Sequence, residues 1–234
     1  MASPASVSSG RSLKRSRVDF TDHITILVGE DERAFLIHKN IACDKSDFFK
    51  AACNSDWKER KEKTIRLPNT EVRTFTIFAC WLYTNELDLN GTGQKPIWST
   101  GMDAELRRNT WMDIYRCYVL GDFLNSAQFC NTLVDELLAS AEATNKIPGP
   151  RIVLHFAGEL RLTSTLGRLL IDSVATEVTK EVFMKNVDSY ATAFVIEVAK
   201  VCVMERNMTL DERQPRNRPK CYYHEHKDEK DKCA

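Results

Sequence analysis

An alternating run near the start of the chain, residues 24–29, constrains the fold more than any other stretch. It reads Ile-Thr-Ile-Leu-Val-Gly, and β-branched residues that alternate and then stop at a glycine are typical of a half-buried strand. Three acidic residues at 30–32 make a polar turn. Residues 33–38 then read as a second strand, so the sequence predicts a β-hairpin.

The hydrophobic period lengthens after the hairpin from two residues towards 3.6, which predicts helices. We expect a short helix pair broken at 44–47, then a third strand at 63–68 that stops at its proline. The apolar side of the helix pair consists of Ile41, Phe48, Phe49 and Ala52. The next helix, 71–82, is apolar around so much of its circumference that it should be largely buried. Its apolar residues are Val72, Phe75, Ile77, Phe78, Ala79, Trp81 and Leu82.

The order of these elements resembles the BTB/POZ domain. In that family a hairpin is followed by a His-Lys phrase with a leucine shortly after it, then by a Ser-x-x-Phe step. A phrase like Leu-Tyr-Thr-Gly-Glu closes the central helix. The corresponding phrases here begin at His38, Ser46 and Leu82. Ile41 keeps the bulk of the family's leucine, and Asn85, in place of the glycine, tolerates a left-handed backbone.

This resemblance implies an α+β class and a BTB/POZ fold, in which a small mixed sheet is flanked by helical hairpins. Residues 114–124 are similar to a phrase in the family's closing helices. The helical pattern after them predicts a C-terminal helical appendage, similar to the helices that follow the domain in related proteins. The expected divisions are a disordered basic tail at 1–20, the domain at 21–144, the appendage at 148–207 and a charged tail at 208–234.

Glycine and proline interrupt the helical pattern at 90–109, where the family usually has a short link. Loops of this length are usually functional or disordered, and we expect Ile97 and Trp98 to dock on the domain itself. Helices then resume behind polar N-caps. The expected caps are Thr110, Ser126 and, for the last of three appendage helices, Asp188, with Thr163 or Ser164 before the middle one.

The charge balance and the cysteine content limit which partners and which cellular compartment we expect for the protein. Thirty-three basic residues offset thirty-three acidic ones, so the whole chain has no field that would attract nucleic acid or anionic lipid. The apolar run 190–204 is interrupted by Glu197 and Lys200 and is too short to span a bilayer. Eight cysteines without a secretory signal before them favour a reducing compartment, cytoplasmic or nuclear.

A small basic cluster in the N-terminal tail leaves two interpretations open. Arg11, Lys14, Arg15 and Arg17 have the composition of a nuclear-import signal. The alternative is a solvated tail, because short basic clusters often have no such function.

The charged C-terminal tail contains the candidate metal site of the sequence. Two thiolates and two imidazoles are a complete tetrahedral set for zinc. They come from Cys221, His224, His226 and Cys233. Cys221 and His224 have the usual short-loop spacing, although the single residue between the two histidines is not a standard finger spacing. Similar Cys-x-x-His-x-His endings occur in fungal proteins that carry a BTB domain alone, and the chain resembles that type. The alternative is an unbound, solvated tail.

Nothing in the sequence predicts an enzyme. It has no Gly-rich phosphate loop, no Gly-x-Ser-x-Gly elbow and no oriented Cys/His pair, so we expect no catalytic residue and no cofactor besides the zinc. His38 is expected to be a packed histidine at a strand end. The BTB/POZ resemblance implies a protein-interaction module that forms homodimers, and it allows an adaptor that binds a cullin ubiquitin-ligase scaffold. A nuclear, transcription-linked protein acting through recruited partners is the alternative.

Overall fold

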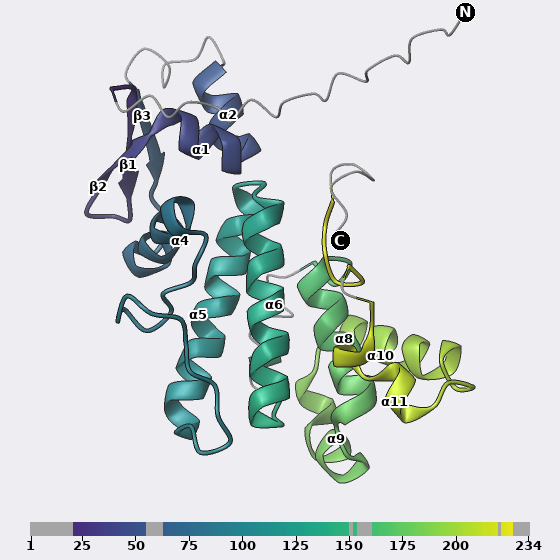
Figure 1. Cartoon of the computed structure of the whole chain (residues 1–234). Helices are drawn as coiled ribbons and strands as arrows, with labels where there is room; N and C mark the ends of the chain where they lie inside the picture. The colour runs from purple at the N-terminus through teal and green to yellow at the C-terminus, as the bar shows by residue number, and fades with distance from the viewer. Residues whose placement is uncertain (1–20, 55–62, 150–151, 154–160, 220, 227–234) are drawn as a thin grey trace, which may run out of the picture.

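The computed structural model describes residues 21–54, 63–149, 152–153, 161–219 and 221–226. Figure 1 shows its elements in three layers: a small sheet with short helices, a central pair of long helices, and a C-terminal group of helices. Several sequence predictions fall outside the described residues. They are the basic cluster Arg11, Lys14, Arg15 and Arg17, residues 154–160 of the first appendage helix, and Cys233.

A mixed sheet of three strands forms the first layer, in the order β2-β1-β3. The strands are β1 (His23–Val28), β2 (Arg33–His38) and β3 (Thr64–Leu67). β1 pairs antiparallel with β2 and parallel with β3. The alternation expected in β1 is the one observed, since Ile24, Ile26 and Val28 are buried. Gly29 follows the strand with a φ of +76°, a conformation that favours glycine. The α+β class and the hairpin are therefore confirmed.

Among the described residues, three short-to-medium helices accompany the sheet. They are α1 (Lys39–Lys45), α2 (Asp47–Asn54) and α4 (Val72–Thr84). The predicted break between the first two lies at Ser46, and α4 is largely buried, as expected. Asn85 ends α4 in the left-handed conformation, with a φ of 56°, and its N–H donates to the carbonyl of Trp81. The asparagine therefore serves where the family has glycine.

Ser46 joins α1 to α2 and fastens both to the central helices. Its hydroxyl accepts a hydrogen bond from the N–H of Phe49 (3.2 Å) and donates to the carbonyl oxygen of Leu124 (2.6 Å). Ser46 is only 1% exposed. The Ser-x-x-Phe step is thus a helix N-cap that also makes a buried hydrogen bond across the fold.

We expect Ser46→Ala to lower the free energy of unfolding by about 1–2 kcal/mol, because the cap is lost and a buried carbonyl loses its donor. Urea denaturation of the two proteins measures the difference. Ser99→Ala is the matched control, because Ser99 is exposed and its substitution should change stability by less than about 0.5 kcal/mol. Equal stabilities of the two variants would contradict the assignment of Ser46.

A hairpin of two long helices forms the central layer. These are α5 (Ala104–Phe123) and α6 (Ala127–Thr144). The expected start of α5 at Thr110 is wrong: Asp103 is the N-cap, and its carboxylate accepts hydrogen bonds from the N–H groups of Glu105 and Leu106. Thr110 lies inside the helix, where its hydroxyl donates to the carbonyl of Leu106. The irregular segment expected over 90–109 therefore ends at residue 103.

Two other expectations around this hairpin are met only in part. Ser126 holds the N-cap position of α6, but its side chain does not cap the helix. The hydroxyl instead donates to the carbonyl of Lys45 (2.7 Å), which ties α6 to the end of α1. Trp98 docks on the core, and its indole N–H donates to Glu136 of α6. Ile97 does not dock, since it is 80% exposed.

The appendage is the third layer. Its described elements are α8 (Thr165–Glu177), α9 (Lys180–Asn186), η1 (Val187–Ser189), α10 (Thr192–Met204), α11 (Leu210–Arg213) and η2 (Pro215–Asn217). Ser164 caps α8, as expected. Asp188 does not cap the next long helix: it lies in η1, and Ala191 precedes α10. Helix α9, capped by Thr179, was not anticipated. Within the described residues, no helix is both long and apolar enough to cross a bilayer.

One hydrophobic core runs through all three layers, from Ile24 to Tyr223. Aromatic rings from α4 and α6 meet in it. The ring centroid of Phe129 lies 5.0 Å from that of Phe78 and 4.9 Å from that of Trp81. All three side chains are fully buried, so this cluster joins the sheet layer to the central hairpin.

The appendage is joined to the central hairpin by a buried polar contact. The hydroxyls of Tyr118 on α5 and Thr165 on α8 share a hydrogen bond of 2.8 Å, and the N–H of Leu166 points at the same tyrosine oxygen (3.4 Å). Burial raises the pKa of Tyr118, so the phenol stays neutral. The start of α8 is therefore fixed against α5.

Candidate functional site

A groove of about 700 Å³ opens between the turn after β3 and one side of α5. Leu67, Val119 and Leu120 contribute apolar surface to it. Its position follows from the fold, because β3 stops at Pro68 and the chain must cross to the start of α4 beside α5. An open groove with apolar and polar walls can receive a side chain or a short segment of another protein.

Phe123 lies at the groove and is 55% exposed. Tyr115 and Tyr118 of the same helix are buried, whereas the Phe123 side chain lies outside the core. The reason is its place at the last position of α5, where it projects beside α2 instead of between the helices. Its ring lies 5.2 Å from that of Phe48, centroid to centroid. The two rings form an aromatic patch on the surface.

Charges of both signs line or flank the groove. Arg116 lies 3.5 Å (Nε to Oε1) from Glu71, and Arg66 lies 3.1 Å (Nε to Oε1) from Glu32. All four side chains are at least 40% exposed, so each pair contributes little to stability. These charges can therefore exchange partners when another surface docks.

A stronger ion pair fixes the helices behind the groove. Arg73 of α4 donates from Nη2 to Asp113 of α5 (2.7 Å) and to the carbonyl of Leu89 (2.7 Å). The Asp113 side chain is only 10% exposed. The hydrogen bond to Asp113 raises the pKa of Arg73. The relative position of α4 and α5 is thus set before any partner binds.

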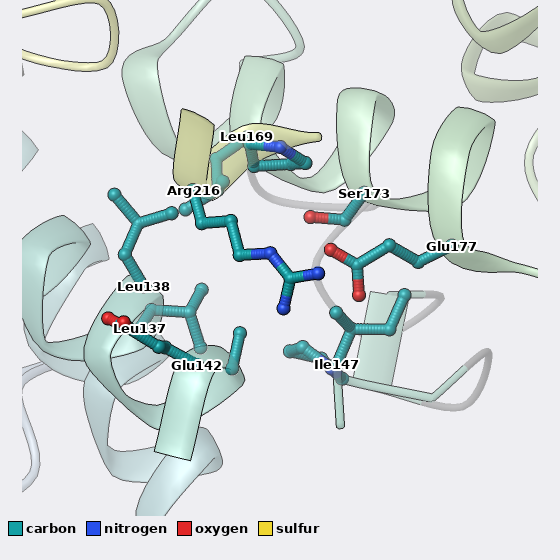
Figure 2. A pocket seen from close by; sticks show the side chains of 11 residues that line it. Leu137, Leu138, Glu142, Ile147, Leu169, Ser173, Glu177 and Arg216 are labelled. Atoms are coloured by element: carbon teal, nitrogen blue, oxygen red, sulfur yellow. The ribbon is translucent and has the colours of Figure 1, made fainter. Parts of the chain in front are cut away.

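A second, much smaller cavity lies in the seam between α6 and α8. Figure 2 shows Arg216 of η2 reaching across it, with its guanidinium directed towards Glu177. Burial raises the pKa of Glu177, and the charge of Arg216 acts in the opposite direction. The cavity of about 20 Å³ has room for about one water molecule. It is a gap in the packing of the seam and not a ligand pocket.

The C-terminal segment, residues 221–226, packs across α6 and α8. Tyr223 is buried, and its hydroxyl donates to Asp172 of α8 (2.7 Å). Asn131 of α6 donates to the carbonyl of Glu225 (2.9 Å) and accepts from its N–H (2.8 Å). Burial raises the pKa of Asp172, opposed by the hydrogen bond from Tyr223. Residues 223–226 are therefore buried or half-buried, which differs from the solvated tail of the alternative interpretation.

The structure brings three of the four predicted metal ligands together. Cys221, His224 and His226 each offer one ligand atom, and these atoms all lie within 4.8 Å of one another. Cys233 lies outside the described residues.

His38, expected to be a packed histidine, has its Nδ1 at 2.9 Å from the hydroxyl of Tyr83.

Sequence reasoning missed the residues that position this cluster. His224 is buried, with its Nε2 at 2.7 Å from Oδ1 of Asp135 on α6. Asn131 makes two hydrogen bonds to the backbone of Glu225. It lies four residues from Asp135, so the two residues share one face of α6. This pair of polar residues one turn apart on α6 was the available signal, but nothing in the sequence identified its partner.

The small mixed sheet with its short helices, followed by a hairpin of two long helices, has the architecture of a BTB/POZ domain. A family model for the BTB/POZ domain matches residues 13–102, and the chain carries a BTB/POZ domain there. This family mediates protein–protein interactions and is generally non-enzymatic. A comparison with curated proteins gave no match. The narrower resemblance to fungal proteins that carry this domain alone stays a prediction.

Proposed function

We propose that the chain is a self-associating interaction module and that two copies meet at the groove. The observation that carries this proposal is Phe123, a large aromatic side chain that is 55% exposed beside Phe48 at the edge of the groove. Aromatic residues in the centre of an interface supply much of its binding energy. A water-exposed phenylalanine next to a groove with apolar and polar walls is therefore best explained by a partner.

A second copy fits this surface because the groove is self-complementary in charge. In a two-fold dimer the same patch lies on both subunits. Arg66 and Arg116 of one copy would then face Glu71 of the other, with the exposed ion pairs exchanging partners at little cost. The apolar centre and charged rim have the composition of a protein interface.

Phe123→Glu should weaken self-association of the full chain by about 30-fold or more, because a buried aromatic anchor contributes about 2 kcal/mol or more. Sedimentation velocity over a concentration series measures the dissociation constant. Met204→Glu is the matched control, since Met204 is 81% exposed on α10 and should leave self-association unchanged. A wild-type chain that stays monomeric at high concentration, or equal weakening by both variants, would sink the proposal.

The appendage offers a separate surface for a second protein. Ile196, Val203 and Met204 of α10 are 50%, 65% and 81% exposed, whereas Phe194 and Val198 of the same helix are buried. We propose that this face of α10 binds a second protein. The dimer would also bind a cullin scaffold and so link the second protein to it. Support for the cullin is membership of the BTB/POZ family. A pulldown that fails where a known BTB adaptor binds the cullin would remove that part and leave self-association standing.

The nuclear, transcription-linked alternative depends on the basic cluster at 11–17. Those residues lie outside the described part of the chain. Nuclear or cytoplasmic localisation therefore stays a prediction from sequence.

A further inference from the structure

We propose that Cys221, His224 and His226 bind a zinc ion that locks the C-terminal segment onto the seam between α6 and α8. The three ligand atoms lie within 4.8 Å of one another. Bonds of about 2.0–2.3 Å in a tetrahedron place ligand atoms about 3.3–3.8 Å apart. Side-chain rotations that move the atoms by about 1 Å would therefore close the site around an ion.

The environment of His224 is that of a metal ligand. Its Nε2 lies 2.7 Å from Oδ1 of Asp135, and its side chain is only 4% exposed. A histidine that binds a metal through one ring nitrogen usually donates from the other to a carboxylate, which fixes the ring and makes it a better ligand. The Asp135 contact assigns Nε2 as the donor and directs Nδ1 to the metal.

The backbone that carries the ligands is held in place before an ion binds. The N–H of His224 donates to the carbonyl of Cys221 (3.2 Å), which makes a turn between these two ligands. Glu225, between the two histidines, is held at both backbone groups by Asn131. Tyr223 anchors the other side of the segment on Asp172. Such preorganisation favours binding, because little chain entropy remains to be lost.

The donor set selects the metal. One thiolate and two imidazoles suit zinc, whereas magnesium and calcium prefer oxygen ligands. These three ligands occupy three positions of a tetrahedron around the ion.

A bound metal ion would strengthen the connection between the central hairpin and the appendage. The segment 221–226 contacts α6 through Asp135 and Asn131, and α8 through Asp172. A metal that fixes this segment therefore fixes the appendage relative to the BTB/POZ domain. The proposal does not depend on self-association, because the cluster and the groove share no residues.

The first experiment is elemental analysis of the full, untagged chain expressed in zinc-supplemented medium and purified under reducing conditions. We expect about one zinc per chain, and replacement by Co²⁺ should give the visible absorption bands of tetrahedral cobalt with thiolate ligands. Cys221→Ser and His224→Ala should lose both signals. Cys202→Ser is the matched control, since Cys202 is exposed on α10, and should keep both.

One further variant keeps the test decisive if the ligand variants fail to fold. Asp135→Asn retains a hydrogen-bond partner for His224 but removes the carboxylate, and should weaken zinc binding about 10- to 100-fold in competition with a chelating dye. A wild-type chain that holds neither zinc nor cobalt, or a Cys221→Ser chain that holds both as before, would overturn the proposal.

Discussion

Phe129→Ala should lower the free energy of unfolding by about 3–5 kcal/mol, because truncating a buried phenylalanine removes apolar contacts and leaves a cavity. Phe129 is 0% exposed, and its ring sits between Phe78 and Trp81 of α4 at centroid distances of 5.0 and 4.9 Å. Each aromatic pair adds about 0.5–1.5 kcal/mol to the burial of its area. The variant therefore weakens the packing between α4 and α6 and does not only destabilise α6 itself.

Guanidinium chloride denaturation of wild type and variant measures this loss. Met204→Ala is the matched control: it removes a side chain that is 81% exposed on a helix, so the change should be within about 0.5 kcal/mol. A loss below about 2 kcal/mol for Phe129→Ala, smaller than large core truncations usually cause, would contradict the central place given to this ring.

Among the glycines that the structure describes, Gly167 should be the most damaging to replace by alanine, at about 2–3 kcal/mol even after the gain in helix propensity. Gly167 lies in the first turn of α8, where an added Cβ would be 2.6 Å from the carbonyl oxygen of Arg161 and 2.8 Å from that of Leu162. Both obstacles are backbone, so they cannot move aside as a side chain can. The turn before α8 or the helix itself must shift.

Two other glycines provide an internal scale for this measurement. At Gly121 the new Cβ would meet Cys130 and Phe129 at 2.8 and 2.9 Å, and these side chains can yield in part. At Gly101 it would meet nothing within 4 Å. Thermal unfolding of the three alanine variants should rank Gly167 as the most destabilised, then Gly121, then Gly101. Any order with Gly101 first would contradict the packing described for α8.

The first half of the fold could be predicted because its signals are local. Alternation marks β1, a glycine ends it, and Asn85 adopts the left-handed conformation that its place at the end of α4 requires. The α4 helix was expected to be buried because apolar residues surround it, and its burial needs no knowledge of its neighbours. These features depend on residues within one turn or one strand of each other.

The errors arise where several capping residues compete or where distant segments decide. Asp103 and Thr110 are both good N-caps, and the longer helix, which starts from Asp103, is the one that forms. The hydroxyl of Ser126 donates to the carbonyl of Lys45, a residue 81 positions away. The local sequence therefore predicts a cap for α6 that the structure does not have. α9 begins at a threonine cap but buries none of its residues, and so lacks the apolar stripe by which helices are recognised.

The candidate sites differ in the same way. The spacing of Cys221, His224 and His226 was visible in the sequence because ligands of one site lie close together along the chain. The groove was not visible, since its walls come from the turn after β3 and from α5, about fifty residues apart. Phe123 reads as a core residue by its type and spacing, and only the end of α5 places it at the surface.

The core that runs unbroken from Ile24 to Tyr223 has a consequence for how the two ends of the molecule communicate. Because the hydrophobic core continues past the boundary expected near residue 144, we expect the domain and the appendage to unfold together in one transition. A ligand that binds only the native state stabilises the whole of a unit that unfolds in one transition. An occupant of the appendage would thereby rigidify the distant groove through shared stability alone, without any hinge or signal passing between them.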